Sequence, residues 1–114
     1  MTLGELYLSI DGRISRSTLW LKYMLPIFII NVIVGIVAAA NPKTGNIISL
    51  IVGLILLWPG IAVSVKRWHD RDKSAWWLLI ALIPIIGWLW AFIELGFLKG
   101  TDGPNRFGQD PVQA

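Results

Sequence analysis

The sequence predicts an all-α integral membrane protein with three transmembrane helices, preceded by a short amphipathic helix at the membrane interface. The first reason is composition: 55% of the 114 residues are apolar and the mean hydropathy is +0.66, too hydrophobic for a water-soluble domain of this length. The second reason is that three runs of 20 to 22 residues carry no charge. At about 1.5 Å per residue, each run can cross a hydrocarbon core of ~30 Å. We therefore expect one membrane domain over residues 1–114.

The segment 2–11 is predicted to be a short helix that lies in the membrane interface. Thr2 and Glu5 have the spacing of a capping box, which marks the start of a helix. The apolar residues that follow recur at helical spacing on one face: Leu3, Leu6, Tyr7 and Ile10. Because so short a helix is not stable alone in water, we expect its apolar face to rest on lipid.

The three uncharged runs define the predicted spans 19–41, 45–66 and 74–97. A short, turn-forming connection makes the first two an antiparallel hairpin. Each span contains a proline, which tends to bend a helix: Pro26, Pro59 and Pro84. In the third span, Pro84 and Gly87 also allow a re-entrant segment that returns to its starting side. The tail 98–114 is rich in turn-forming residues and is predicted to be extended, outside the bilayer.

A charged cytoplasmic loop, 67–73, is predicted between the second and third spans. With three spans, the N-terminal segment and this loop share a side that carries seven Lys and Arg residues, whereas the turn and the tail carry three. The positive-inside rule then places the N-terminus in the cytoplasm and the C-terminus in the periplasm or outside the cell. A re-entrant third segment would instead return the tail to the cytoplasm.

The cations on the predicted cytoplasmic side are expected to bind lipid head groups or another anion: Arg13, Arg16, Lys66, Arg67, His69 and Lys73. Such cations form charge-assisted hydrogen bonds with phosphate and are attracted to anionic leaflets. The competing interpretation is that they only set the orientation of the spans. Asp70 and Asp72 are expected to form structural ion pairs with Arg13 or Arg16, clamping the N-terminal segment to the loop.

Catalysis and metal binding have little support in the sequence. His69 is the only histidine, there is no cysteine, and a hydrolytic metal centre needs three or more protein ligands. We therefore expect no enzyme activity, no metal and no cofactor. The basic residues cluster at the membrane edges, so we expect membrane lipids as partners and no nucleic acid.

Five segments, in order along nearly the whole chain, resemble the motifs of a known family. They are GRISR at 12–16, KRWHD at 66–70, KSAWW at 73–77, IPIIG at 83–87 and GPNRFGQDP at 103–111. The chain thus resembles the small bacterial inner-membrane family of the domain of unknown function 805. Trp68 stands where that family often has Leu, and Ala75 where Gly is common. The resemblance implies a multi-pass inner-membrane protein, and it implies no substrate.

The predicted function is that of a small non-enzymatic inner-membrane protein that acts through a basic cytoplasmic face on anionic lipid head groups or a protein partner. Small residues on one face of the second span favour a homo-oligomer: Gly53, Gly60 and Ser64. The alternative is a small transporter or channel component, with the three prolines around an ion or solute path. Glu94, next to the third uncharged run, or Asp70 would then lie on that path. The competing interpretation of Glu94 is an interfacial carboxylate near Lys99, outside any path.

Overall fold

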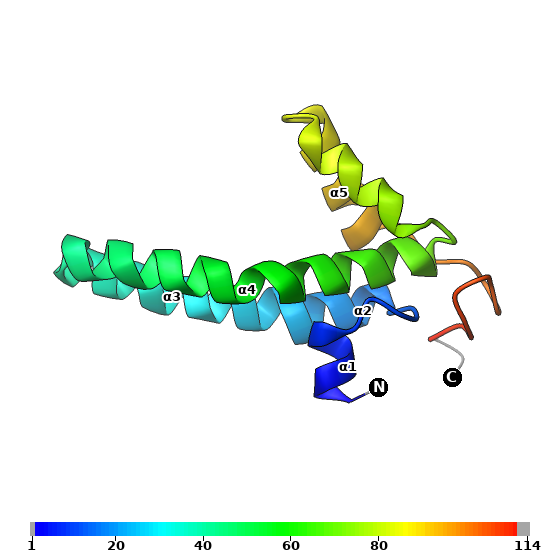
Figure 1. Cartoon of the computed structure of the whole chain (residues 1–114), viewed down its shortest axis with the longest axis horizontal. Coiled ribbons are helices and arrows are strands. Elements are labelled where there is room, and N and C mark those ends of the chain that lie inside the picture. Colours follow the sequence, from blue (N-terminus) through cyan, green and yellow to red (C-terminus); the bar gives the residue numbers. More distant parts are fainter. Residues whose placement is uncertain (1, 112–114) are drawn as a thin grey trace.

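Two long helices lie side by side in opposite directions and set the length of the molecule (Figure 1). The computed structural model describes residues 2–111, whose regular elements are all helices. The first long helix joins α2 (Arg16–Leu19), the π-helical η1 (Trp20–Met24) and α3 (Leu25–Ala40), and the second is α4 (Pro42–Asp70). Both are long and apolar enough to cross a membrane. Two of the three predicted spans thus correspond to helices of membrane-spanning length.

The turn between the long helices is tight. Asn41 separates α3 from α4, and its Oδ1 accepts a hydrogen bond from the Thr44 N–H at 3.2 Å, which caps α4. One turn into α4, Gly45 lies so close to α3 that a Cβ there would overlap the backbone of Ala38. The backbones of the two helices are therefore in contact next to the turn.

α1 (Leu3–Leu8) is shorter than the predicted helix 2–11 and packs on the long pair (Figure 1). It lies near the end of the pair where α2 begins and α4 stops, which we call the charged end. The Glu5 N–H donates to Thr2 Oγ1 at 3.1 Å, which caps the helix. Leu6 is buried in a small apolar cluster with Ile14, Leu19 and Val63. This cluster joins α1 to both long helices.

Two further hydrogen bonds fix α1 against the long pair. The Tyr7 hydroxyl donates to the carbonyl of Lys22, which Pro26 cannot bond because it has no N–H. Trp58 Nε1 of α4 donates to the carbonyl of Leu8 at 2.7 Å. The proline in the first span therefore provides an acceptor that holds the N-terminal helix.

The predicted third span, 74–97, is not one helix. It consists of the 3₁₀ helix η2 (Ala75–Leu82) and α5 (Ile86–Gly96), which fold back on each other. The reversal occurs at Ile85, which has a φ of 62°, and Trp88 Nε1 then donates to the Ala81 carbonyl at 2.8 Å across the hairpin. The chain thus reverses in the region of Pro84 and Gly87, as the re-entrant alternative requires, whereas a single helix over 74–97 is not seen. Gly87 is required there because a Cβ would overlap the Ile80 carbonyl.

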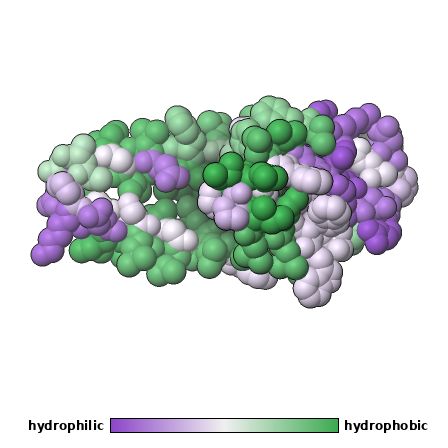
Figure 2. Space-filling view, turned by 90° about the horizontal axis from the view of Figure 1, so that it is seen from above, coloured by the Kyte–Doolittle hydropathy of each residue, from purple (hydrophilic) through white to green (hydrophobic). Residues whose placement is uncertain are grey.

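The folded-back hairpin changes two predictions about the charged end. α4 continues to Asp70, so the predicted loop 67–73 is helical over most of its length. The tail lies at the same end as the N-terminal segment, since the Thr101 N–H donates to the Asp70 carbonyl at 2.6 Å. The structure thus places the tail at the same end of the long pair as the N-terminal segment, whereas the three-span prediction placed it opposite. Hydrophilic residues gather at both ends of the long pair, and apolar residues cover most of the length between them (Figure 2).

The close approach beside the turn can be tested with one glycine from each long helix. Gly45→Ala should lower stability by about 1–3 kcal/mol, because the new methyl group must displace the backbone of Ala38. Gly35→Ala, on α3, is the matched control, since nothing lies within 4 Å of its Cβ position. Alanine there should be neutral or stabilising by up to about 1 kcal/mol. Thermal unfolding in detergent measures both; equal midpoints for the two variants would refute the helix contact.

Candidate functional site

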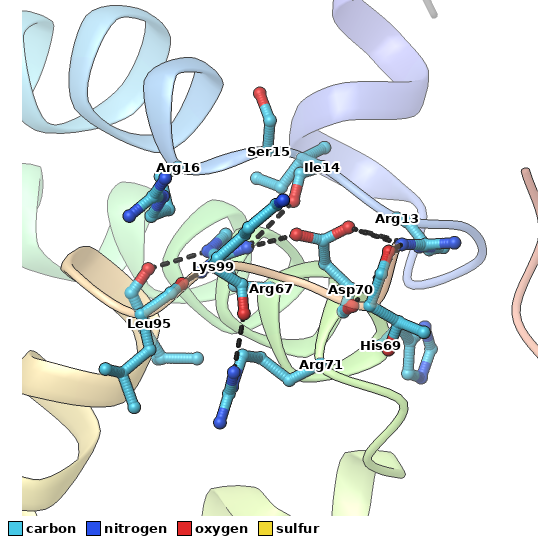
Figure 3. Close-up of polar contacts among 12 residues, drawn as sticks. Arg13, Ile14, Ser15, Arg16, Arg67, His69, Asp70, Arg71, Leu95 and Lys99 are labelled. Atoms are coloured by element: carbon cyan, nitrogen blue, oxygen red, sulfur yellow. Dashed lines mark hydrogen bonds and ion pairs between the residues drawn. The ribbon is translucent and has the colours of Figure 1, made fainter. Parts of the chain in front are cut away.

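Asp70, at the end of α4, is the centre of a buried ionic cluster (Figure 3). Its Oδ1 accepts from Arg13 Nε at 3.1 Å and lies 3.0 Å from Arg13 Nη2, and its Oδ2 accepts from Arg67 Nη1 at 2.5 Å. The three side chains are at most 4% exposed. Gly100 lies directly against the carboxylate, where a Cβ would overlap it. We call Arg13, Arg67 and Asp70 the ionic clamp.

Arg67 uses its other donors on backbone carbonyls of distant segments. Nε donates to Leu95 at 2.6 Å, Nη2 to Leu98 at 2.9 Å, and Nη1 also to Ile14 at 3.2 Å. Carbonyls at the end of a helix lack an intrahelical donor, and a cation there also compensates the helix dipole. Arg67 therefore caps α5 and ties it to α4 and to the segment before α2.

Arg13 ties the tail to the same carboxylate. Its Nη2 donates to the Thr101 carbonyl at 2.6 Å, and its Nη1 donates to the carbonyls of Gly103 at 2.7 Å and Gly108 at 3.2 Å. Three carbonyls of the described tail, 98–111, thus accept hydrogen bonds from one guanidinium group.

Lys66 and His69 are also buried and bonded to the chain itself. Lys66 Nζ donates to the carbonyls of Glu5, at 2.5 Å, and Leu6, which caps the end of α1. His69 Nδ1 lies 2.9 Å from the Gly12 carbonyl, and its ring stacks on Phe107 with a centroid distance of 3.9 Å. The last turns of α4 therefore bind the N-terminal segment and the tail together.

Glu94 forms a second ionic group at the base of the hairpin. Its Oε1 pairs with Lys73 and lies 3.4 Å from Arg71 Nε, and its Oε2 accepts from Trp90 Nε1 at 2.5 Å. Glu94 therefore joins the two ends of the hairpin.

The predicted site residues fall into two groups. Four of the six predicted anion-binding cations are buried, with donors bonded to Asp70 or to carbonyls: Arg13, Lys66, Arg67 and His69. Arg16 is exposed and donates to the Phe97 carbonyl at 2.7 Å, while Lys73 is partly exposed beside Glu94. Anion binding by this set stays a prediction.

The two acids predicted to form ion pairs, Asp70 and Asp72, both do so. Of the two partners expected for Asp70, the structure pairs it with Arg13 and leaves Arg16 elsewhere. Asp72 pairs with Arg106 of the tail, Oδ1 to Nε at 3.1 Å, instead of with the N-terminal segment. Within residues 2–111, no three His, Asp or Glu side chains are grouped to hold a metal ion.

Sequence reasoning gave no role to the tail residues Arg106 and Phe107, which contact Asp72 and His69. The predicted third span had placed the tail on the other side of the membrane. The only available signal was the re-entrant alternative at Pro84 and Gly87, which brings the tail back to these residues.

Neutralising Asp70 should destabilise the protein far more than neutralising Asp72. Asp70→Asn leaves two buried guanidinium groups without a carboxylate, and losing one partner of a buried ion pair costs about 3–5 kcal/mol. Asp72→Asn is the matched control, because its pair with Arg106 is exposed and such pairs contribute about 0–1 kcal/mol. Thermal unfolding in detergent compares them; an Asp70→Asn loss no larger than that of the control would contradict a clamp.

Comparison with known proteins agrees with the resemblance. The model of the family described as Protein of unknown function (DUF805) matches residues 7–109. Inner membrane protein YhaH of Escherichia coli (strain K12) is 36% identical over 108 residues, which cover 92% of this chain and 88% of YhaH. Inner membrane protein YhaI of the same strain is 34% identical over 116 residues, 92% of this chain and 87% of YhaI.

A third relative, Uncharacterized protein YiiR of Escherichia coli (strain K12), is 32% identical over 142 residues, covering 96% of this chain and 90% of YiiR. No solved structure matches the chain. The family match covers nearly all described residues, including the clamp and the hairpin. The chain therefore belongs to the DUF805 family and, like YhaH and YhaI, is an inner-membrane protein.

Proposed function

We propose that this protein is a non-enzymatic inner-membrane protein that acts at the cytoplasmic surface, through the exposed cations of its charged end, on anionic lipid head groups. The observation that supports this is the division among its cations. Four cations of the charged end are buried or nearly so and use their donors within the chain, whereas four others have exposed side chains: Arg16, Lys22, Lys99 and Arg106. We call these four the cationic rim.

Members of the cationic rim remain available to phosphate groups. Lys99 pairs with Asp102 and Arg106 with Asp72, but the two cations are 63% and 62% exposed. Ion pairs this exposed contribute little, because water and salt screen them. An anionic leaflet adds about 1 kcal/mol of attraction for each nearby Lys or Arg. Head groups can therefore compete with these surface pairs.

The charge distribution supports a cytoplasmic charged end. All ten Lys and Arg residues lie within residues 2–111, and nine of them belong to the charged end. Only Lys43 lies at the turn between the long helices. On the positive-inside rule, both the N-terminal segment and the tail are then cytoplasmic and the turn is periplasmic.

Self-association is part of the proposal. Gly53 on α4 is exposed, with nothing within 4 Å of its Cβ position, so another helix can approach closely there. Asn31 is an exposed amide in the middle of the first long helix, and amides at such depth favour helix association. These features support a homo-oligomer within the membrane.

The transporter or channel alternative has less support. Its candidate path residues, Asp70 and Glu94, are both bonded within the charged end. The groove beside Pro26 and Pro59, the two prolines of the long helices, has an almost entirely apolar lining. Neither observation indicates a path for ions.

The proposed orientation can be tested with single cysteines, because the chain contains none. Asn46→Cys, next to the turn, should react with a membrane-impermeant maleimide in intact spheroplasts. Asp102→Cys, in the tail, should react only after permeabilisation, since the tail is bonded to the cytoplasmic end. Reaction of Asp102→Cys before permeabilisation would refute this orientation and return the tail to the periplasm.

The cationic rim can be tested by the lipid that surrounds the protein. A triple variant, Arg16→Gln, Lys99→Gln and Arg106→Gln, should lose most of the enrichment of phosphatidylglycerol over phosphatidylcholine, because each cation adds about 1 kcal/mol of attraction. Lys43→Gln, at the other end, is the control and should keep it. Raising the ionic strength from 0.1 to 1 M should weaken enrichment for the wild type, as the Debye length falls from about 10 to about 3 Å.

The measurement is lipid composition in nanodiscs formed from a defined mixture, and the mass of the same particles counts the chains. Equal enrichment for the wild type and the triple variant would exclude the rim as the lipid-binding surface. A single chain per particle at all protein-to-lipid ratios would exclude the homo-oligomer.

A further inference from the structure

One member of the cationic rim, Lys22, lies between two hollows of different character. It follows Thr18 by one turn on the first long helix, where the charged end meets the apolar helices. Its backbone carbonyl accepts from Tyr7, which fixes α1 beside it. Its ammonium group has no hydrogen-bond or ion-pair partner within residues 2–111. Lys22 therefore carries an exposed ammonium group that pairs with no anion among these residues.

The first hollow is polar and lies on the side of the tail. It has a volume of about 480 Å³, and its polar lining comes from Arg13, Thr18, Lys22 and Gln109. Leu6 and Ile14 contribute an apolar wall. The guanidinium of Arg13 adds positive charge, although its donors are already bonded to Asp70 and the tail. A hydroxyl and an ammonium group one helical turn apart can together bind a phosphate oxygen.

The second hollow is apolar and runs between the two long helices. It has a volume of about 340 Å³, and Lys22 stands at its charged end with Pro26, Ile27, Ile30, Leu56 and Pro59 beyond. From Lys22 to Ile30 the helix advances about 12 Å toward the middle of the membrane. An occupant of this groove contacts almost only apolar side chains, so it must itself be apolar.

The geometry points to a site for one anionic phospholipid, with its phosphate at Lys22 and Thr18 in the polar hollow and one acyl chain in the groove beside Pro26 and Pro59. Lys22 lines both hollows, so a single molecule with an anionic group joined to an apolar chain fits them together. Free phosphate matches only the first hollow. A zwitterionic lipid brings a second cation next to Lys22 and Arg13, which disfavours it.

This site rests on the proposed function and makes it specific, because it requires one lipid at a fixed position instead of a loose layer of head groups. Lipid binding by the cationic rim and lipid binding at Lys22 can be distinguished by experiment. Binding by the cationic rim involves several lipids, falls with salt and depends on Arg16, Lys99 and Arg106. Binding at Lys22 has a stoichiometry of one per chain and depends on the length of the acyl chain.

The experiment is a lipid titration of the detergent-purified full chain, followed by native mass spectrometry. Dioleoyl phosphatidylglycerol should bind once per chain, about tenfold more tightly than dioleoyl phosphatidylcholine. Lys22→Gln should weaken this binding about tenfold, as expected for loss of a charge-assisted hydrogen bond, and Lys22→Arg should largely restore it. Lys43→Gln is the charge control and should bind like the wild type.

A second pair of variants tests the groove. Ile30→Trp fills it and should weaken the binding of dioleoyl phosphatidylglycerol about tenfold while leaving dihexanoyl phosphatidylglycerol unchanged. Ile33→Trp is the size control, because Ile33 is 56% exposed on the same helix and does not line the groove. Thermal unfolding in lipid-free detergent checks that all variants are folded like the wild type.

Three results would overturn the site: equal binding by Lys22→Gln and Lys43→Gln, equal binding by Ile30→Trp and Ile33→Trp, or displacement of the lipid by millimolar sodium phosphate, which would indicate a simple anion site. Failure of the proposed function gives a different pattern. In that case the rim triple variant keeps its lipid enrichment in nanodiscs, whereas the single lipid at Lys22 is still lost in Lys22→Gln.

Discussion

A buried carboxylate between two buried guanidinium groups is the interaction on which the charged end depends. Asp70 neutralises only one of the two positive charges, so the remaining donors of Arg13 and Arg67 must be met by other acceptors. They are met by carbonyls at the end of α5, before α2 and in the tail. One ionic cluster thus holds four segments together: the end of α4, the end of α5, the segment before α2 and the tail.

The same cluster explains why the third apolar segment folds back as a hairpin instead of forming one long helix. Arg67 binds the carbonyls at the end of α5, and Glu94 near that end pairs with Lys73 just before η2 begins. Both ends of the hairpin are therefore held at the charged end of the long pair. The uncharged length predicted the two long apolar helices but not the hairpin within 74–97, because length carries no information about a reversal such as that at Ile85. Pro84 and Gly87 indicated the reversal only as an alternative.

The candidate site was less predictable than the fold. A cation at a membrane edge has the same sequence signature whether it faces lipid or caps a helix, and Lys66 and Arg67 proved to cap α1 and α5. The distinction depends on which carbonyls lie nearby: those of α1 for Lys66, and those at the end of the folded-back hairpin, which the three-span prediction lacked, for Arg67. Lys22 illustrates the converse: the sequence used it only for orientation, but the structure leaves it exposed and without an anion.

Burial of the clamp cations is compatible with their use as an orientation signal, because the two roles apply at different stages. While the helices insert, Arg13, Lys66 and Arg67 are not yet bonded, so their full charge opposes transfer across the membrane. After folding, the same charges are bonded to Asp70 and to carbonyls. Of the nine cations at that end, those of the cationic rim then remain the most exposed.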